Sequence, residues 1–576
     1  MRHLCFTILL LLCCGHDRGA VAQQRPNILF VLTDDQGIGD LSLHGNDSIR
    51  TPNLDALLLR SARFDRFYVS PVCAPTRASF LSGMYHPRTG AVFVTRRREN
   101  MDAGVTTIAE YLREAGYRTG LFGKWHNGAT FPYHPAGQGF TEFLGFTLGH
   151  FNDYFTGRLR NERDEAVPFQ GDLTRIFTDS AMHFMARDSS PFFCMLAYQA
   201  PHTPVQVTDE RWNAVRPRGL TDYNTGIYAM VESVDQQIGR LVEELRRNGK
   251  LGNTIIVFST DNGPNGDRYR QGLRGTKGQV DEGGVRVPFG IRIPGNPANG
   301  RIISTPAAHI DLLPTLLEAV GGPAPAGVDG MSLLPLLRGG NFPERYVYAF
   351  GQGYDYTGYP GSMRNDRYLY VARDSNNHEL YDLLEDPGQQ TDLYAETEIG
   401  PRMAATYRQF ATSIGRPELV APPIDLLAAP DTVRLLAHEG EPTGRTRFRD
   451  DYGWANDYFV DLGVDGAYWP VTAARSRQFE VVVRYHLDAP VPRSITVATD
   501  AGTRLLGSLP PARTEELPVA DRVPRKEVYP RAWGEAVLGV LQIPPGTNRI
   551  TIASPVQTGE ETGLWVKELV LRPTGE

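Results

Sequence analysis

The sequence predicts a doubly wound α/β domain, followed by a small α+β subdomain and an all-β sandwich domain. Three apolar runs end in polar residues: NILFVLTDD (27–35), PFFCMLAYQAPH (191–202) and NTIIVFSTDNG (253–263). Their apolarity is continuous rather than alternating, as in parallel strands buried on both faces. Helical patterns lie between them, and strand–helix alternation is typical of a doubly wound sheet. After residue 432, short alternating strands separated by Pro and Gly indicate a sandwich.

The chain begins with a pattern that predicts export. A basic start is followed by an apolar run, Leu4 to Cys14, that is too short to span a membrane, and Ala20-Val21-Ala22 forms a cleavage site. We expect a signal peptide over residues 1–22 with cleavage after Ala22. Lipidation of Cys13 or Cys14 is the alternative, so the mature chain is expected in the periplasm, on the cell surface or secreted, with no transmembrane segment.

The α/β domain is predicted over residues 23–335. TTIAEYLREAG (106–116) carries a capping box at Thr107 and Glu110 and a glycine stop, and AMVESVDQQIGRLVEELRRNG (229–249) is amphipathic up to Gly249. The α+β subdomain is expected over 336–415, a Pro-rich linker over 416–431 and the sandwich over 432–576. The net charge of −7, with no long basic run, argues against a nucleic-acid partner.

Two cysteines remain after the signal peptide. Cys194 lies in an apolar run and is interpreted as a buried small hydrophobe, so no disulfide framework is predicted. Cys73 begins CAPTRASFLSG, where Pro75 suits a first helical turn and Gly83 a helix end. The amides of a helix N-terminus stabilise an anion there. The residues alone leave two interpretations open, a thiol nucleophile and an inert cysteine beside a helix cap.

Polar residues follow the predicted strands. In an open α/β sheet, ligands bind beyond the carboxyl ends of the strands, so these residues share one edge. Oxygen-bearing side chains in such a group suit Ca²⁺ or Mg²⁺, although each pair alone is more typical of turns and caps than of a metal site. Lys124 and His126 are separated by one residue, so we expect their side chains on one face of an extended segment. The predicted edge set is Asp34, Asp35, Lys124, His126, His202, Asp261, Asn262 and Lys277, joined by Cys73 and Arg77.

From about Arg25 to Tyr394, the chain resembles the type I, formylglycine-dependent sulfatases of the alkaline phosphatase superfamily. CAPTRASFLSG matches the first signature of that family and GYRTGLFGKWH (116–126) matches the second. Matching Asp-Asp, Pro-His, Asp-Asn-Gly and Arg-Gly-x-Lys elements join them in the same order. The resemblance implies an alkaline-phosphatase-like catalytic fold and hydrolysis of sulfate esters.

The resemblance also implies how residue 73 is used. A formylglycine-generating enzyme would oxidise Cys73 to Cα-formylglycine, whose hydrated aldehyde attacks the sulfur of a sulfate ester. Asp34, Asp35, Asp261, Asn262 and residue 73 would ligate Ca²⁺ rather than Mg²⁺, while Arg77 and Lys124 hold the diol and sulfate oxygens. His202 would protonate the leaving oxygen beside Lys277, and His126 would deprotonate the second hydroxyl so that sulfate is expelled.

Export and the added sandwich predict a sulfated carbohydrate substrate. The last strands of the sandwich resemble galactose-binding-like jelly rolls, and a packing domain that never touches sugar is the alternative. His150, Asp153 and Arg96–Arg98 either border the pocket or are solvated loop residues, and His309 is expected to be structural. Two other functions remain open: a phosphate or phosphonate ester hydrolase of the same superfamily, and a non-catalytic sugar-binding surface protein.

Overall fold

A computed structural model describes residues 25–322, 325–415, 422–428, 432–450, 452–555 and 563–574. The predicted signal peptide and lipidation sites lie outside these residues, as does most of the predicted linker. Within the described part of the chain, no helix has the length and apolarity needed to cross a bilayer.

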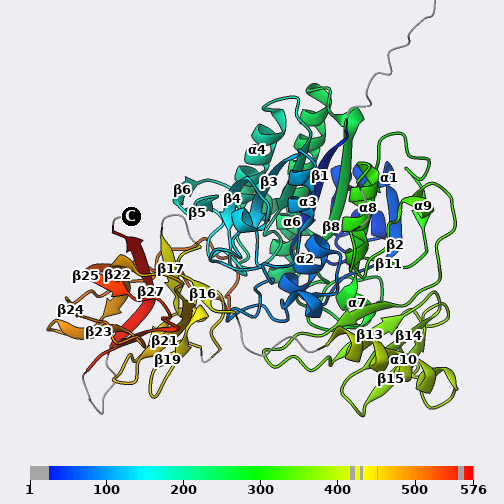
Figure 1. Cartoon of the computed structure of the whole chain (residues 1–576). Coiled ribbons are helices and arrows are strands. Elements are labelled where there is room, and N and C mark those ends of the chain that lie inside the picture. The colour runs from blue at the N-terminus through cyan, green and yellow to red at the C-terminus, as the bar shows by residue number, and fades with distance from the viewer. Residues whose placement is uncertain are drawn as a thin grey trace, which may run out of the picture.

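The largest sheet occupies the centre of the molecule (Figure 1). Its strands run in the order β10 (Ile302–Ile303), β2 (Ala62–Tyr68), β9 (Arg286–Arg292), β8 (Thr254–Thr260), β1 (Asn27–Thr33), β7 (Phe192–Ala197), β3 (Arg118–Lys124), β4 (Glu142–Phe146), β5 (Thr156–Asn161) and β6 (Ala166–Gln170), with β11 (Ala307–Ala308) paired to β2. β8, β1, β7, β3 and β4 are parallel to one another, whereas β9 pairs antiparallel with β8 and β5 pairs antiparallel with β4. The three apolar runs form β1, β7 and β8, which confirms that prediction.

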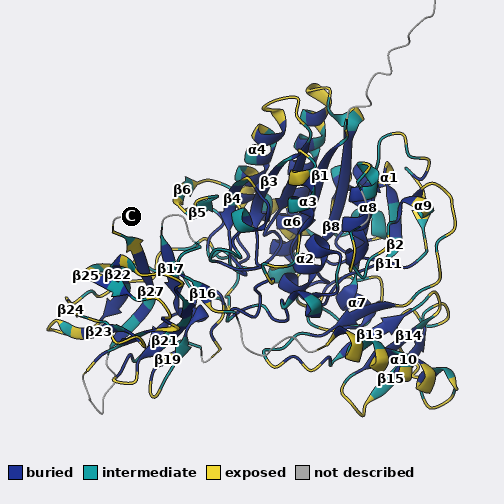
Figure 2. Cartoon of the chain, viewed as in Figure 1, coloured by how far each residue is buried: buried dark blue, intermediate teal, exposed yellow. Residues whose placement is uncertain are grey.

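Both faces of this sheet are covered, which explains the continuous apolarity. Alternate residues of β1 enter two cores: Ile28, Phe30 and Leu32 join one, and Leu29 and Val31 join the other. Figure 2 shows the central strands as buried throughout. The first core is closed by α2 (Cys73–Ser82), α3 (Ile108–Glu114), α8 (Leu312–Ala319) and α9 (Leu334–Leu337), and the second by α1 (Pro52–Leu59), α4 (Leu173–Ala186), α5 (Asp209–Val215) and α6 (Asp222–Arg247).

The helix-end signals act as predicted. Thr107 and Glu110 form the capping box of α3, with the Thr107 side chain accepting from the Glu110 amide and Glu110 accepting from the Thr107 amide. Gly83 ends α2 in the left-handed region, with φ of 70°. Cys73 is thus the first residue of a helix.

A smaller antiparallel sheet follows the large one in sequence. It contains β12 (Val347–Phe350), β13 (Gly361–Arg364), β14 (Tyr368–Ala372) and β15 (His378–Asp382). Helix α10 (Ile399–Ile414) contributes Met403, Ala404 and Tyr407 to the same core. The short helix α7 (Glu282–Val285) leads into β9.

The C-terminal residues form two sheets around one core, as predicted for a sandwich. One sheet holds β16 (Ile424–Asp425), β18 (Glu441–Pro442), β21 (Ala467–Thr472), β23 (Arg493–Thr499), β24 (Arg504–Leu509) and β26 (Arg549–Ala553). The other holds β17 (Val433–Leu436), β19 (Arg447–Phe448), β20 (Phe459–Val460), β22 (Arg477–Leu487), β25 (Gly534–Ile543) and β27 (Leu564–Pro573). Alternate residues of β22 and β23 fill the space between them.

Candidate active site

Four neighbouring parallel strands bring most of the predicted residues to one edge of the sheet. Thr33 of β1 pairs with Thr260 of β8, so Asp34 and Asp261 leave the sheet side by side. Lys124 ends β3, and the chain after β7 reaches His202 five residues beyond the strand. This is the carboxyl edge, where ligands bind in open α/β sheets.

Cys73 enters this group from the N-terminus of α2. Its side chain is buried. Asp34, Cys73 and Asp261 each offer one potential metal-ligand atom, and these three atoms lie within 4.8 Å of one another. Burial raises the pKa of the Cys73 thiol, although Lys124 and Lys277 act in the opposite direction. The unmodified residue is therefore a poor thiolate nucleophile, despite its place at a helix N-terminus.

Arg77, one turn further along α2, is fully buried and binds the same carboxylates. Its Nε and Nη2 donate to Asp261 Oδ2 at 3.0 and 2.8 Å, and Nη2 lies 3.6 Å from Asp34 Oδ2. Its Nη1 donates to the Lys124 carbonyl at 2.9 Å, which ties the helix to the end of β3. Burial and the Asp34 carboxylate raise the pKa of Asp261 to about 6, in spite of Arg77.

Two lysines complete a charged group that we call the cradle: Asp34, Asp35, Asp261, Arg77, Lys124 and Lys277. Lys124 Nζ donates to Asp34 Oδ2 at 2.5 Å, and Lys277 Nζ lies 2.7 Å from Asp35 Oδ1. Burial raises the pKa of Asp35, but the Lys277 ammonium and His202 outweigh burial and bring this pKa below its ordinary value. Burial lowers the pKa of Lys277, but Asp35 outweighs it and raises this pKa above its ordinary value.

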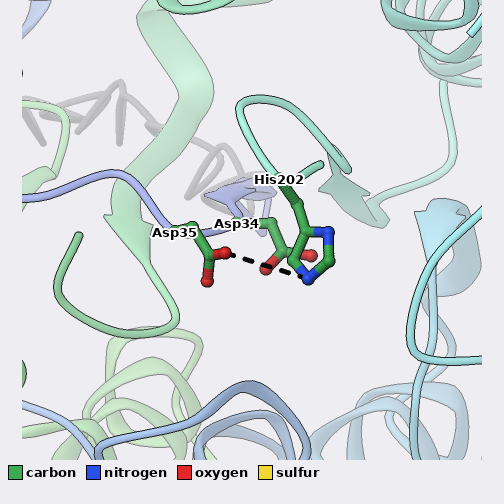
Figure 3. Close-up of side chains that lie close together, drawn as sticks. All are labelled: Asp34, Asp35 and His202. Carbon is green, nitrogen blue, oxygen red and sulfur yellow. Dashed lines mark ion pairs between the residues drawn. The ribbon is translucent and has the colours of Figure 1, made fainter. Parts of the chain in front are cut away.

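The His202 ring lies close to the side chains of the two consecutive aspartates, Asp34 and Asp35 (Figure 3). Its Nε2 lies 3.8 Å from Asp35 Oδ2, and its Nδ1 lies 2.7 Å from the Thr203 carbonyl. A carbonyl only accepts, so Nδ1 carries the proton and Nε2 faces the cradle with its lone pair. Burial and the Lys277 charge lower the pKa of His202 to about 4.

His126 reaches the site differently from the expectation. The predicted extended segment ends at Lys124, and His126 adopts a φ of 68°, in the left-handed region that non-glycine residues rarely occupy. Its Nε2 lies 2.9 Å from the Val94 carbonyl, so this nitrogen carries the ring proton. Its Nδ1 is buried without a hydrogen-bond partner in the described part of the chain. Burial, with Lys124, lowers its pKa well below the ordinary value.

The oxygen atoms around Asp34 fit a hard cation. Asp34 Oδ1 and Asn262 Oδ1 are both buried and accept no hydrogen bond from the described residues. Asn262 Nδ2 donates to Asp35 Oδ1 at 2.7 Å, which turns the amide oxygen away from that carboxylate. Carboxylate and amide oxygens are the ligands that Ca²⁺ and Mg²⁺ take in proteins, so this donor set fits either ion.

Two residues of the C-terminal sandwich, Asn456 and Glu527, contact the active-site loops, and the sequence patterns did not indicate either of them. His150 stacks parallel to His202 with ring centroids 6.2 Å apart, and Asn456 Nδ2 donates to the His150 carbonyl at 3.0 Å. Thr203 Oγ1 donates to Glu527 Oε1. These sandwich residues lie between β19 and β20 and between β24 and β25, where no apolar periodicity marks them.

Three other residues named from the sequence, His309, Asp153 and Arg96, make structural contacts outside the cradle. His309 is buried and its Nε2 contacts Ser70 Oγ at 3.0 Å, in line with a structural role. Asp153 accepts the amides of Phe155 and Thr156 at 2.7 and 3.0 Å, which is a turn contact. Arg96 pairs with Glu441 of the sandwich at 2.6 Å, so it joins two parts of the chain rather than lying in solvent.

Comparisons with known proteins agree with this geometry. The Sulfatase family model matches residues 26–322, and the model "N-sulphoglucosamine sulphohydrolase, C-terminal" matches residues 276–412. Arylsulfatase A of Homo sapiens is 31% identical over 445 residues, covering 65% of this chain and 84% of that protein. N-acetylgalactosamine-6-sulfatase of Canis lupus familiaris is 31% identical over 381 residues, covering 60% and 72%.

A solved structure gives the same result. The structure "Ps i-CgsB in complex with k-i-k-neocarrahexaose" aligns with a TM-score of 0.64 and 28% identity, over 69% of this chain and 94% of that chain. The Sulfatase model spans more than half of the 576 residues, and the described site carries the residues of both signatures. This chain therefore belongs to the sulfatase family and hydrolyses sulfate esters.

Proposed function

We propose that this sulfatase removes sulfate from carbohydrates, with Cα-formylglycine at position 73 and a bound Ca²⁺. The observation that carries the proposal is the position of residue 73, buried beside Asp34 and Asp261 at the centre of the cradle. A sulfate ester is anionic, and its transition state places negative charge where Arg77, Lys124 and Lys277 converge. This arrangement favours sulfuryl transfer to residue 73.

Carbohydrate as the substrate class has two supports. The similar proteins include N-acetylgalactosamine-6-sulfatase and a structure in complex with a neocarrahexaose. The printed name of each refers to a carbohydrate. In this chain, the sandwich lies against the loops that carry His150 and His202, so an extended substrate would meet it on leaving the cradle.

The modified residue and the cation would supply the chemistry that a thiol does not. Hydrated formylglycine provides an oxygen nucleophile and a second hydroxyl, whose deprotonation drives sulfate off the enzyme. A cation held by Asp34, Asp35, Asp261 and Asn262 would supply positive charge to the nucleophile and the sulfate. Ca²⁺ is proposed over Mg²⁺ because the resemblance of the two signatures to those of formylglycine-dependent sulfatases implies Ca²⁺.

The surrounding side chains have separable roles in this proposal. Arg77 and Lys124 would hold oxygens of the diol and sulfate, and Lys277 would hold the ester oxygen. His202, whose Nε2 faces the cradle, would carry the proton to the leaving alcohol once the anionic substrate is bound beside it. His126, whose buried Nδ1 is unpartnered, would accept the proton of the second hydroxyl.

The proposal extends to maturation and location. Residues 1–22 would direct export, and a formylglycine-generating enzyme would oxidise Cys73 before the chain folds, since the folded chain buries it. The division into residues 23–335, 336–415 and 432–576 is likewise proposed as the domain organisation.

The test is sulfate release by protein that has been co-expressed with a formylglycine-generating enzyme. We expect release from one class of sulfated sugar, mass-spectrometric detection of the aldehyde at residue 73, and no release by Cys73→Ala. Cys194→Ala is the matched control, because Cys194 is buried in β7 away from the cradle, and it should keep most of the activity. Faster hydrolysis of phosphodiesters or phosphonates than of every sulfate ester would contradict the proposal, as would turnover by Cys73→Ala.

A further inference from the structure

A segment of the sandwich, Tyr452–Asn456, lies directly on the active-site loops. Thr95 Oγ1 donates to the Gly453 carbonyl at 2.6 Å, and Asn456 binds the carbonyl of His150. Between these two contacts, a Cβ built on Gly149 would lie 2.8 Å from His126 Nε2 and 3.5 Å from Ala455 Cβ. Only the backbone of Gly149 therefore separates His126 from the sandwich.

Two aromatic rings of this segment face solvent at that seam. Tyr452 and Trp454 are 48% and 39% exposed, and they stack with centroids 4.3 Å apart and planes 18° apart. Phe93, which is buried, supports both rings at 6.1 and 6.2 Å. Phe93 directly precedes Val94, whose carbonyl contacts His126 Nε2, so the exposed pair is anchored next to the catalytic loop.

The exposure of Trp454 sets it apart from the other five tryptophans of the chain, which are buried or half-buried. Large aromatic rings contribute most to stability when they are buried. Exposed apolar surface with a polar rim is a feature of ligand-binding sites. Arg96 lies over the ring of Phe448, the ring that a Cβ on Gly453 would meet at 2.9 Å, and Arg96 also pairs with Glu441.

We propose that Tyr452 and Trp454 form a sugar subsite beside the cradle. It would hold a ring of the carbohydrate chain that neighbours the ring carrying the reacting sulfate; this inference depends on the proposed carbohydrate substrate. A pyranose presents a flat C–H face with hydroxyls around its edge, and that face matches an aromatic surface with a polar rim. The occupant is part of the substrate, because the rings are continuous with the loop that holds His126.

The proposal makes the sandwich a part of the substrate pocket rather than a separate module. A small aryl sulfate would fill the cradle and would not reach the subsite, whereas an oligosaccharide would occupy both. The subsite should therefore raise the specificity constant for the oligosaccharide relative to that for the aryl sulfate. This ratio is insensitive to variations in formylglycine content between preparations.

The experiment compares kcat/KM for 4-nitrophenyl sulfate with kcat/KM for hexasaccharides cut from carrageenan, chondroitin sulfate and heparan sulfate. For the hexasaccharide that the parent enzyme desulfates fastest, Trp454→Ala should lower the ratio about tenfold, or about 1.4 kcal/mol. The loss should fall mainly on KM, and Trp454→Phe should restore most of the ratio. Tyr346→Ala, which removes a 37% exposed tyrosine next to β12, is the matched control and should leave the ratio unchanged.

Two results would overturn the subsite: an unchanged ratio in Trp454→Ala, or a parent enzyme that desulfates single sugars but no hexasaccharide. Neither affects the proposed carbohydrate sulfatase activity. Failure of that activity has a different signature, because the parent would then release sulfate from 4-nitrophenyl sulfate and from no sugar of any length.

Discussion

At the scale of single residues, the cradle is a balance of buried charges. Three cations, Arg77, Lys124 and Lys277, face three carboxylates, those of Asp34, Asp35 and Asp261. Unpaired charges would be costly in this buried position, and pairing offsets part of that cost. A divalent cation and a sulfate ester, which carries one negative charge, would together add one positive charge, and the sulfate dianion released as product would cancel the charge of the cation.

Local sequence alone did not determine which individual residues belong to the active site. Asp-Asp and Asp-Asn-Gly pairs commonly make turns, and nothing local distinguishes Asp34 or Asp261 from such pairs. The strand register brings them together, and the two long signatures made that register foreseeable. Glu527 and Asn456 lie in irregular loops of another domain, so no local pattern could assign them to the site.

Glu439 provides a pH-dependent prediction, because it is a carboxyl buried away from the cradle. Burial and the nearby Glu99 raise its pKa from 4.5 to about 8, although Arg97 and Arg434 act in the opposite direction. The folded state thus retains a proton that the unfolded state releases, and stability falls as the pH rises from about 5 to 8. Glu439→Gln cannot ionise, so its Tm should exceed that of the parent by several degrees at pH 8 and by little at pH 5.

The measurement is thermal unfolding of both proteins across this pH range. Glu515→Gln, an exposed glutamate of the same domain, is the control and should follow the parent at every pH. A Tm difference between Glu439→Gln and the parent that stays constant from pH 5 to 8 would show that this carboxyl does not hold its proton.

At the scale of elements, the fold was largely predictable where the sheet is buried on both faces. β1, β7 and β8 are continuous apolar runs, and the capping box of α3 is a local signal. β2, with the sequence ARFDRFY, and the last two strands at one end of the sheet, β5 and β6, carry partly exposed residues and mixed patterns. Their places in the sheet depend on tertiary pairing, which a local pattern does not contain.

The second signature owes one of its glycines to the packing of β3. Gly123 has a φ of 120°, and a Cβ there would lie 1.8 Å from the Ala197 carbonyl oxygen of β7. No side chain fits between the two strands at this point. The close approach places Lys124, the next residue, where its Nζ reaches Asp34.

We expect Gly123→Ala to destabilise the protein by about 3 kcal/mol or more, because it combines backbone strain with a clash against main chain. Sulfatase activity should fall with it, as Lys124 is displaced. Gly116→Ala is the matched control within the same signature, since Gly116 also has a positive φ, 84°, but no heavy atom lies within 4 Å of its added Cβ. It should cost about 1–2 kcal/mol. Equal shifts of the urea midpoint in both variants would refute the role of the close approach.

At the scale of the whole molecule, two segments of the sandwich contact the loops around His126 and His202, in addition to the Arg96–Glu441 ion pair. Besides Tyr452–Asn456, the stretch 521–527 runs along residues 203–209, which follow His202. Gln206 Nε2 donates to Asp521 Oδ1 at 2.7 Å, and the Arg522 amide donates to the Val205 carbonyl at 2.9 Å. Figure 1 shows the sandwich lying on one side of the α/β domain and the α+β subdomain on another.

From the contacts of residues 521–527 we predict that the sandwich holds the loop after His202, residues 203–209, in place. Arg522 is its main anchor, since its Nε and Nη2 donate to the Val207 carbonyl at 3.1 and 2.8 Å and its Nη2 reaches Asp209 at 2.6 Å. Without these bonds, residues 203–209 should open more often, because local opening follows the loss of the hydrogen bonds that protect a loop. In Arg522→Ala we expect amide hydrogen exchange over 203–209 to be several-fold faster.

The same variant should lower kcat for a sulfated sugar a few-fold, because His202 would be less well oriented over Asp35. Arg513→Ala is the matched control: this arginine pairs with Asp488 on the exposed surface of the sandwich, and its removal should change neither exchange nor kcat. If residues 203–209 exchange at the parent rate in Arg522→Ala, the Arg522 side chain does not hold the loop. The bonds from Gln206 to Asp521 and from Thr203 to Glu527, which this variant keeps, would then be the contacts left to test.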